Sequence, residues 1–278
     1  MLDLLFRETC PACGGASGAG FCSVCAADMP RAGAVCRGCG LTLPVAHCPR
    51  RAAPWAIDAV VAPFAYAQPL DRHIRQLKYG GARALGRAFA LLLAPAVRAL
   101  TGEIDVLVAV PLHGTRLRER GYNQAIEIAR PLSRQTGVPM LLRGIERRHG
   151  SPSQTGQAAA ARRASVANAF RVTRNLAGLR VAIVDDVITT GATVNALAAA
   201  LRGAGAARCI AVGVARTPEN RGSAEDVVES DAAEHGAAEP RVVQERAEAL
   251  ATVAVPDQIG LVERECSGRN EPAVIPRA

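Results

Sequence analysis

The sequence is short of lysine and of aromatic side chains: Lys78 is the one lysine among 33 basic residues, and aromatics make up 3% of the chain. Because Tyr79 follows Lys78, no G-x-x-x-x-G-K-[ST] loop is present, which excludes a P-loop nucleotide-binding protein. The nearest approach to a dinucleotide fingerprint, GAGAAR from Gly203 to Arg208, lacks its third glycine and follows a helical pattern. The few aromatics argue against a surface that stacks nucleic-acid bases.

Long apolar runs are also missing. The longest, Ala88 to Val97, is about half of the roughly 20 residues that a membrane helix needs. The start, MLDLLFRETC, places Asp3 and Arg7 in an apolar run that is too short for the core of a signal peptide. We therefore expect a cytoplasmic protein without membrane insertion. In that reducing compartment, closely spaced cysteines indicate metal binding rather than disulfides.

The formal net charge of +8 is unevenly distributed. Residues 219–278 hold 13 acidic and 6 basic side chains, a net of −7, so residues 1–218 carry a net of +15. Such a basic body favours polyanionic partners, which include phosphorylated ligands and nucleic acid. The acidic segment is rich in Ala and Glu and lacks sustained periodicity, which predicts a disordered tail.

The most informative stretch is RVAIVDDVITTGATVNALAAAL, which runs from Arg180 to Leu201. Val181 to Val184 form a continuous apolar run, which is typical of a buried parallel strand. Asp185 and Asp186 follow at its carboxyl end, where open α/β sheets bind ligands. The small residues after them let backbone N–H groups wrap an anion at a helix start: Thr189, Thr190, Gly191, Ala192 and Thr193. Carboxylates beside an anion loop suit the hydroxyls and the phosphate of a ribose 5-phosphate.

An ordinary strand-to-helix turn is the alternative interpretation of this stretch. In that case Thr193 caps the helix, and the two aspartates are solvated turn residues. Two adjacent carboxylates at a strand end, followed at once by TTGAT, favour the ligand site.

This segment resembles the phosphoribosyl diphosphate (PRPP) binding motif of the type I phosphoribosyltransferases. Two further stretches are similar to the ComF family, which is linked with DNA uptake in competent bacteria: VPLHGTRLRERGYNQAIEIAR (Val110 to Arg130) and SPSQTGQAAAARRASVANAF (Ser151 to Phe170). The cysteine-rich start resembles the same family. The resemblance covers about residues 10–218 and implies an α/β phosphoribosyltransferase fold with a parallel sheet, preceded by a small zinc ribbon.

The resemblance also implies roles for single residues. Asp185 and Asp186 would hold the ribose hydroxyls and, through water, a Mg²⁺ ion, while residues 189–193 would cradle the 5-phosphate. His113 and Arg116 lie in the segment that corresponds to the pyrophosphate loop of the superfamily. An arginine fork can hold two phosphate oxygens at once; a solvated basic helix start is the alternative.

Lys78 completes the set of predicted catalytic residues, with Asp185 and Asp186. ComF relatives carry a similar lysine at this position, where it would neutralise the leaving pyrophosphate; an ordinary surface lysine is the alternative. The polar stretch 144–168 corresponds to the loop that closes over the substrate in type I enzymes.

Seven of the nine cysteines lie within the first 48 residues. Four of them supply a complete thiolate set for one tetrahedral zinc: Cys10, Cys13, Cys22 and Cys25. The second set has three members, which are Cys36, Cys39 and Cys48. The family pattern has a fourth cysteine where Arg51 stands; His47 is the obvious substitute, and a missing second zinc or a remodelled ribbon are the alternatives. A structural role for zinc is expected, because a small module with few apolar residues needs a metal to fold.

We expect three parts: a zinc ribbon over residues 1–52, a phosphoribosyltransferase domain over 53–218 and the acidic tail over 219–278. In the central part, apolar patterns predict strands over 56–67 (as an antiparallel edge), 105–110, 139–143, 169–172, 181–184 and 209–215. Helical spacing is predicted over 70–100 with a break at 79–81, and again from 121 towards 137.

The predicted function is PRPP- and Mg²⁺-dependent phosphoribosyl transfer in a protein linked to competence and DNA uptake. Two alternatives stay open. One is a non-catalytic scaffold of the same fold that binds single-stranded DNA and transformation proteins. The other is a nucleobase salvage enzyme. The sequence specifies neither the acceptor nor the oligomeric state.

Overall fold

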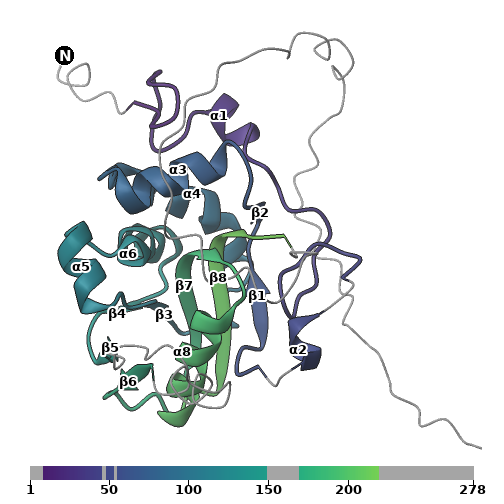
Figure 1. Ribbon diagram of the computed structural model, residues 1–278, viewed down its shortest axis with the longest axis vertical. Helices are drawn as coiled ribbons and strands as arrows, with labels where there is room; N and C mark the ends of the chain where they lie inside the picture. Colours follow the sequence, from purple (N-terminus) through teal and green to yellow (C-terminus); the bar gives the residue numbers. More distant parts are fainter. Residues whose placement is uncertain (1–8, 46–47, 53–54, 149–168, 219–278) are drawn as a thin grey trace, which may run out of the picture. The chain divides into compact units, whose positions relative to one another are not determined.

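A parallel six-stranded sheet organises the residues that the computed structural model describes, which are 9–45, 48–52, 55–148 and 169–218 (Figure 1). Five strands pair in the order β1 (Ala59–Val61), β8 (Arg208–Arg216), β7 (Arg180–Ile188), β3 (Val106–Ala109) and β4 (Met140–Leu141). The sixth, β2 (Phe64–Ala65), pairs with β8 beyond the end of β1. The parallel α/β sheet expected from the sequence is confirmed.

The edge of the sheet differs from the expectation. The prediction of an antiparallel edge over residues 56–67 is wrong, because β1 and β2 both run parallel to β8. Parallel strands need long crossover connections, and two helices supply one between β2 and β3: α3 (Leu70–Tyr79) and α4 (Ala84–Arg98). The outer edge of β1 is not left open, since the N–H of Val60 donates to the carbonyl of Arg37 in the cysteine-rich segment.

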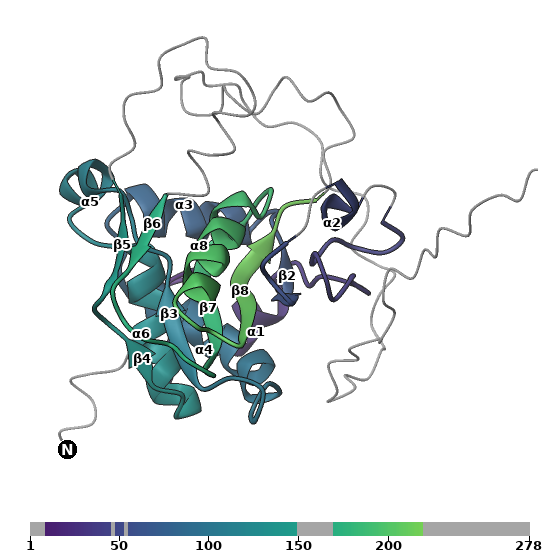
Figure 2. The same cartoon turned by 90° about the horizontal axis from the view of Figure 1, so that it is seen from below.

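Helices cover both faces of the sheet. The chain passes from β3 through α6 (Gln124–Thr136) to β4, and from β7 through α8 (Ala192–Gly203) to β8, in opposite directions across the sheet. Right-handed crossovers therefore place α6 and α8 on opposite faces, as Figures 1 and 2 show. On its face, α6 packs closely against α4: a Cβ added at Gly86 would lie 2.6 Å from the carbonyl oxygen of Glu127.

β7 is longer than its apolar run. It pairs with β8 as far as Ile188, whereas its pairing with β3 ends at Val184, opposite Ala109. The reason is that β8 stays extended over nine residues, of which the central seven are apolar or glycine, while Pro111 follows the end of β3. Asp185 and Asp186 thus lie in the part of β7 that pairs with β8, but beyond the part that pairs with β3.

Two cysteine turns precede the sheet. Each is closed by an antiparallel bridge, Thr9 with Ala16 and Val35 with Thr42, and short helices follow at α1 (Ser23–Ala27) and α2 (Pro49–Ala52). Phe21 anchors the first turn, because its ring lies 5.5 Å from that of His73 on α3 and 5.7 Å from that of Phe89 on α4.

A two-stranded antiparallel sheet stands apart from the main one. It pairs β5 (Ile145–Arg147) with β6 (Phe170–Val172) and so forms the base of the predicted closing loop. Residues 149–168 of that loop and the predicted tail, 219–278, lie outside the described residues, as does His47. The predicted domain boundaries stay a prediction. In the described part of the chain, no helix has the length and apolar character needed to cross a bilayer.

Candidate functional site

A buried ion pair joins two of the predicted catalytic residues. Asp186 Oδ2 lies 3.2 Å from Lys78 Nζ, and these side chains are 3% and 23% exposed. Asp186 Oδ1 accepts a hydrogen bond from the N–H of Val187, whereas Oδ2 accepts none within the described residues. Burial favours the neutral amine, but the two aspartates outweigh it and raise the pKa of Lys78. The pair therefore keeps a charged lysine at the site, next to a carboxylate oxygen with unused hydrogen-bonding capacity.

The segment after β3 fixes the position of Lys78. The hydroxyl of Tyr122 donates to the carbonyl of Leu77, one residue before Lys78 near the end of α3. The next residue, Asn123, caps α6 by accepting from the N–H of Ala125, and it donates to the carbonyl of Val110. Because Asn123 is buried and both ends of its amide are bonded, the end of β3 and the end of α3 are held to one helix start.

Asp185 has a different environment from Asp186. Successive strand residues point to opposite faces; Asp186 meets α3 on one face. Burial and the charge of Arg116 lower the pKa of Arg147 on β5, and the charge of Asp185 opposes this shift. Burial, followed by the neighbouring charge of Asp186, raises the pKa of Asp185 well above its usual range. The folded protein therefore holds an acidic side chain whose ionised form is disfavoured until a cation or donor approaches.

Asp185→Asn is expected to raise the stability of the ligand-free protein at neutral pH. A carboxyl group with a raised pKa binds its proton more tightly in the folded state, so stability falls as pH rises from the unfolded value, about 3.9, to the folded one. Above that range the full penalty applies, and the amide removes it. Melting temperatures measured from pH 3.5 to 8 should coincide at the acid end and separate in favour of the variant as pH rises. A difference independent of pH would contradict this account.

The predicted phosphate loop is an open helix start. Gly191 has φ +82° and precedes Ala192, the first residue of α8, without a side-chain cap. The hydroxyl of Thr190 accepts from the N–H of Ala192, and Thr189 and Thr190 are exposed. The alternative in which Thr193 caps the helix is wrong, because Thr193 is the second residue of α8. An uncapped helix N-terminus beside small residues suits an anion.

Gly191 is also pressed against an aromatic ring. A Cβ added there would lie 2.6 Å from Cη2 of Trp55, the single tryptophan of the chain. Gly191→Ala is therefore expected to lower the free energy of unfolding by about 2–4 kcal/mol, since a left-handed non-glycine residue costs roughly 1–2 kcal/mol and overpacking adds to it.

The matched control for this substitution is Gly178→Ala, because Gly178 has φ +73° and no atom within 4 Å of the added Cβ. Only the backbone term, about 1–2 kcal/mol, applies there. Denaturant unfolding of both variants gives the comparison, and equal losses would show that the tryptophan contact carries no weight.

The two predicted pyrophosphate residues fall on different parts of α5 (Gly114–Arg120). His113 is its N-cap, where Nδ1 accepts from the N–H of Thr115. Arg116 is exposed on the helix, and its charge, after burial, helps to lower the pKa of Arg147. At the site, Lys78 contacts Asp186, the charge of Asp185 acts on both Lys78 and Arg147, and the charge of Arg116 acts on Arg147. His113 caps α5.

A cavity of about 820 Å³ lies beside this group. Pro111 and Leu112 line it from the end of β3, Ile145 and Arg147 from β5, and Arg171 from β6. Its walls are apolar with arginines among them, which suits a ligand that has a flat apolar body and an anionic part.

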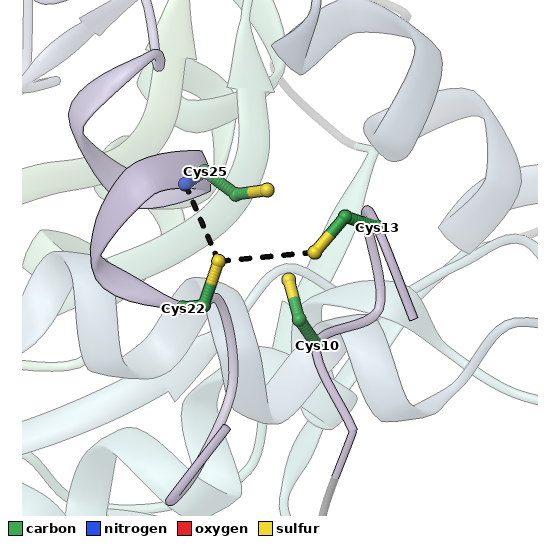
Figure 3. Close-up of side chains that lie close together, drawn as sticks. All are labelled: Cys10, Cys13, Cys22 and Cys25. Carbon is green, nitrogen blue, oxygen red and sulfur yellow. Dashed lines mark hydrogen bonds between the residues drawn. The ribbon is translucent and has the colours of Figure 1, made fainter. Parts of the chain in front are cut away.

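The first cysteine cluster has the geometry of a tetrahedral metal site (Figure 3). The Sγ atoms of Cys10, Cys13, Cys22 and Cys25 lie within 4.8 Å of one another and point to a common centre. The Cys13–Cys22 distance of 3.8 Å equals the S–S separation, about 3.8 Å, expected for tetrahedral Zn–S bonds of about 2.3 Å.

The thiols of this cluster differ in acidity. Burial would raise the pKa of Cys10, but N–H groups of Cys22, Cys13 and Ala12 stabilise its thiolate and lower it to about 6. Sharing hydrogen bonds with Cys22 and Cys13 raises the pKa of Cys25 to about 12. A metal would have to displace a firmly held proton from Cys25, so the metal affinity should decrease as the pH is lowered.

The second cluster contains the three predicted cysteines. The Sγ atoms of Cys36, Cys39 and Cys48 lie within 4.8 Å of one another, and all three residues are buried. Burial raises the pKa of Cys39. Within the described residues no fourth ligand joins them.

Comparison with known proteins gives two family matches: residues 83–236 match the phosphoribosyl transferase domain, and residues 1–55 match the double zinc ribbon domain. DNA utilization protein YhgH of Salmonella typhi is 35% identical over 68% of this chain and 86% of its own length. Competence protein F of Haemophilus influenzae is 33% identical over 71% of this chain and 90% of its own. The chain belongs to the ComF family.

A solved purine phosphoribosyltransferase from Pyrococcus horikoshii is 22% identical over 53% of this chain and 82% of that one, with a TM-score of 0.28. At that score it adds nothing to the sequence matches. This ComF-family chain is a competence-linked protein of the phosphoribosyltransferase type, and the ribbon match together with the cysteine clusters indicates structural zinc.

Two residues of this ComF-family site were not identified as site residues from the sequence. Arg147 comes near enough to Asp185 for their charges to interact, because β5 pairs with the distant β6. Trp55 reaches Gly191 because the chain before β1 runs along α8, where the N–H of Ala56 donates to Asn195 Oδ1 at 2.7 Å. The single tryptophan directly after the cysteine module was the available signal for the second contact.

Proposed function

We propose that this chain binds PRPP together with Mg²⁺ and transfers the phosphoribosyl group to a nitrogen acceptor, with release of pyrophosphate, in the cytoplasm. One observation carries the proposal: buried Asp186 pairs through Oδ2 with Lys78, and its strand leads directly into a helix start whose N-cap is Gly191. In that arrangement the carboxylate can bind a sugar diol, Lys78 a diphosphate, and the helix start a terminal phosphate.

The roles follow from the chemistry of each group. Asp185 and Asp186 accept hydrogen bonds from the ribose 2′- and 3′-hydroxyls, while the N–H groups of residues 189–193 surround the 5-phosphate. Arg116 and Lys78 stabilise the negative charge that grows on pyrophosphate as the C1–O bond breaks. Lys78 can leave Asp186 for this anion once the carboxylate has another counter-charge.

The two aspartates would also hold the Mg²⁺ ion, directly or through its water. Magnesium prefers carboxylate oxygens and keeps several waters, and Asp186 Oδ2, which accepts no hydrogen bond besides its ion pair with Lys78 within the described residues, fits such a partner. When bound, the ion supplies positive charge to the diphosphate. The raised pKa of Asp185 fits the same role, because a nearby cation favours its ionised form.

Zinc is proposed as a structural ion. Cys10, Cys13, Cys22 and Cys25 would hold one ion completely, and Cys36, Cys39 and Cys48 would hold a second with one position left for another ligand.

Calorimetric titration with PRPP in the presence of Mg²⁺ tests the binding step, and release of pyrophosphate with a panel of free bases or ammonia tests the transfer. Saturable binding that depends on Mg²⁺ is expected. Absence of PRPP binding by a folded, zinc-loaded protein would refute the proposal.

A second candidate is a DNA-binding scaffold of the same fold, linked to DNA uptake. The favouring observation is a set of arginines on α5 and beside the cavity: Arg116, Arg118, Arg120, Arg147, Arg148 and Arg171. Affinity for single-stranded DNA measured against salt, with and without PRPP, separates the two candidates. A steep salt dependence that PRPP and the Asp186→Asn substitution leave unchanged would favour the scaffold.

A further inference from the structure

We propose that Trp55 and Arg216 are positioning residues that couple the second cysteine cluster to the phosphate loop, so that zinc in this cluster sets the affinity of the loop for its anion. This inference rests on the proposed function, because it assigns a control to the same PRPP site. It goes beyond a structural role for zinc, because an ion with only a structural role would not change the affinity of the loop for its anion.

The first connection is made by the indole ring of Trp55. On one side the ring packs against the apolar cluster formed by Cys36, Cys39, Leu41 and Cys48. On the other side its outer edge is in close contact with Gly191, where any side chain would collide with Cη2 and Cζ2. A rigid ring therefore spans the space between the three thiolates and the residue at the corner of the phosphate loop.

The peptide after Trp55 fixes the ring to α8. The N–H of Ala56 donates to Asn195 Oδ1 at 2.7 Å, and its carbonyl accepts from Arg202 Nε at 2.7 Å. Arg202 also pairs with Asp58 at 2.5 Å. Asn195 and Arg202 both lie on α8, the helix that directly follows the phosphate loop. A displacement of the ring would therefore be transmitted to the start of α8.

The second connection is the buried guanidinium of Arg216 at the end of β8. Its Nε donates to the carbonyl of Cys39 at 3.0 Å, and its Nη1 donates to the carbonyl of Ile188 at 2.9 Å. Ile188 is the last residue of β7 and directly precedes Thr189. One side chain thus ties the second cysteine pair to the entry of the loop, while Trp55 contacts its exit.

The buried charge of Arg216 strengthens this second connection. Arg216 is 6% exposed, and within the described residues its hydrogen-bond partners are backbone oxygens and the hydroxyl of Thr217. A buried charge without a counter-charge is strongly destabilising. The carbonyl groups of Cys39 and Ile188 stabilise it instead, so the place of Arg216 depends on the positions of both the cluster and the loop entry.

The test combines three variants with three measurements on the full chain. The variants are Cys48→Ser, which removes a ligand of the second cluster, Trp55→Ala, which removes the ring, and Trp55→Phe, which keeps a smaller ring. The measurements are zinc content, affinity for PRPP with Mg²⁺, and the emission of Trp55, which reports on one position because the chain has no other tryptophan.

Wild type should contain two zinc ions per chain and Cys48→Ser one, with a red-shifted Trp55 emission and at least tenfold weaker PRPP binding. Trp55→Ala should keep both ions and cooperative unfolding but lose at least tenfold in affinity, while Trp55→Phe stays within about threefold. One zinc in wild type, unchanged emission on loss of the second ion, or wild-type affinity in Trp55→Ala would each overturn the coupling.

Failure of the proposed function gives a different pattern. In that case wild type does not bind PRPP at all, yet the shift in Trp55 emission between wild type and Cys48→Ser still reports whether the ring responds to zinc in the second cluster. If wild type binds PRPP but the Trp55 emission does not change on loss of zinc, the coupling is refuted and the proposed function stands.

Discussion

Replacing Asp185 and Asp186 together by asparagine is expected to weaken PRPP binding in the presence of Mg²⁺ by at least about 100-fold, or about 2.7 kcal/mol. Hydrogen bonds to charged groups contribute roughly 1.5–3 kcal/mol each, and both carboxylates also serve the cation. In addition, the variant leaves Lys78 without the partner that lies 3.2 Å away. Calorimetry with PRPP, with and without Mg²⁺, measures the loss.

Asp105→Asn is the matched control for this double variant. Asp105 precedes β3 at the opposite end of the strand, and its ion pair with Arg180 lowers its pKa to about 2. This substitution should reduce stability without altering PRPP affinity. Near-wild-type affinity in the double variant would remove the basis of the proposed site, whereas equal losses in both proteins would indicate a general effect on folding.

Cys13→Ser is expected to remove one zinc ion per chain and to destabilise the protein by several kcal/mol. Structural zinc binds small peptide modules with about 10–16 kcal/mol of apparent free energy, which becomes folding free energy. Cys13 is exposed, so the loss cannot come from packing. Without the ion, Phe21 would no longer be held against His73 and Phe89, and α3 would lose support. Zinc analysis and thermal unfolding measure both effects.

Cys209→Ala provides the comparison for a cysteine outside the clusters. Cys209 is fully buried in β8, and burial raises the pKa of its thiol to about 11, so it is a packing residue. Its substitution should cost a modest amount of stability and leave the zinc content unchanged. If Cys13→Ser retained full zinc content, the assignment of the first cluster would be wrong.

The sequence was most informative where local chemistry decides the structure. The apolar run of β7 and the glycine before α8 predicted a strand, a loop and a helix in the right order, because each depends on neighbouring residues. The first four cysteines predicted their own cluster, since their spacing already limits the geometry.

Features that depend on distant pairing could not be predicted in the same way. The direction of β1 follows from the crossover through α3 and α4, not from its own apolar pattern. The contact of Trp55 with Gly191 and the approach of Arg147 to Asp185 need the packed fold. The opposite directions of Asp185 and Asp186 were available from strand alternation, but only once β7 was known to continue through them.

The ion pair of Lys78 makes this chain unusually simple to probe by covalent chemistry. Its side-chain amine is the only one that the sequence provides, and it is held against a buried carboxylate. An acylating reagent would thus form a stable side-chain amide at that position alone, at a rate set by how often the amine separates from Asp186 and loses its proton. If a bound ligand slows this reaction, the fraction of acylated protein measured by mass spectrometry gives the fraction of occupied sites.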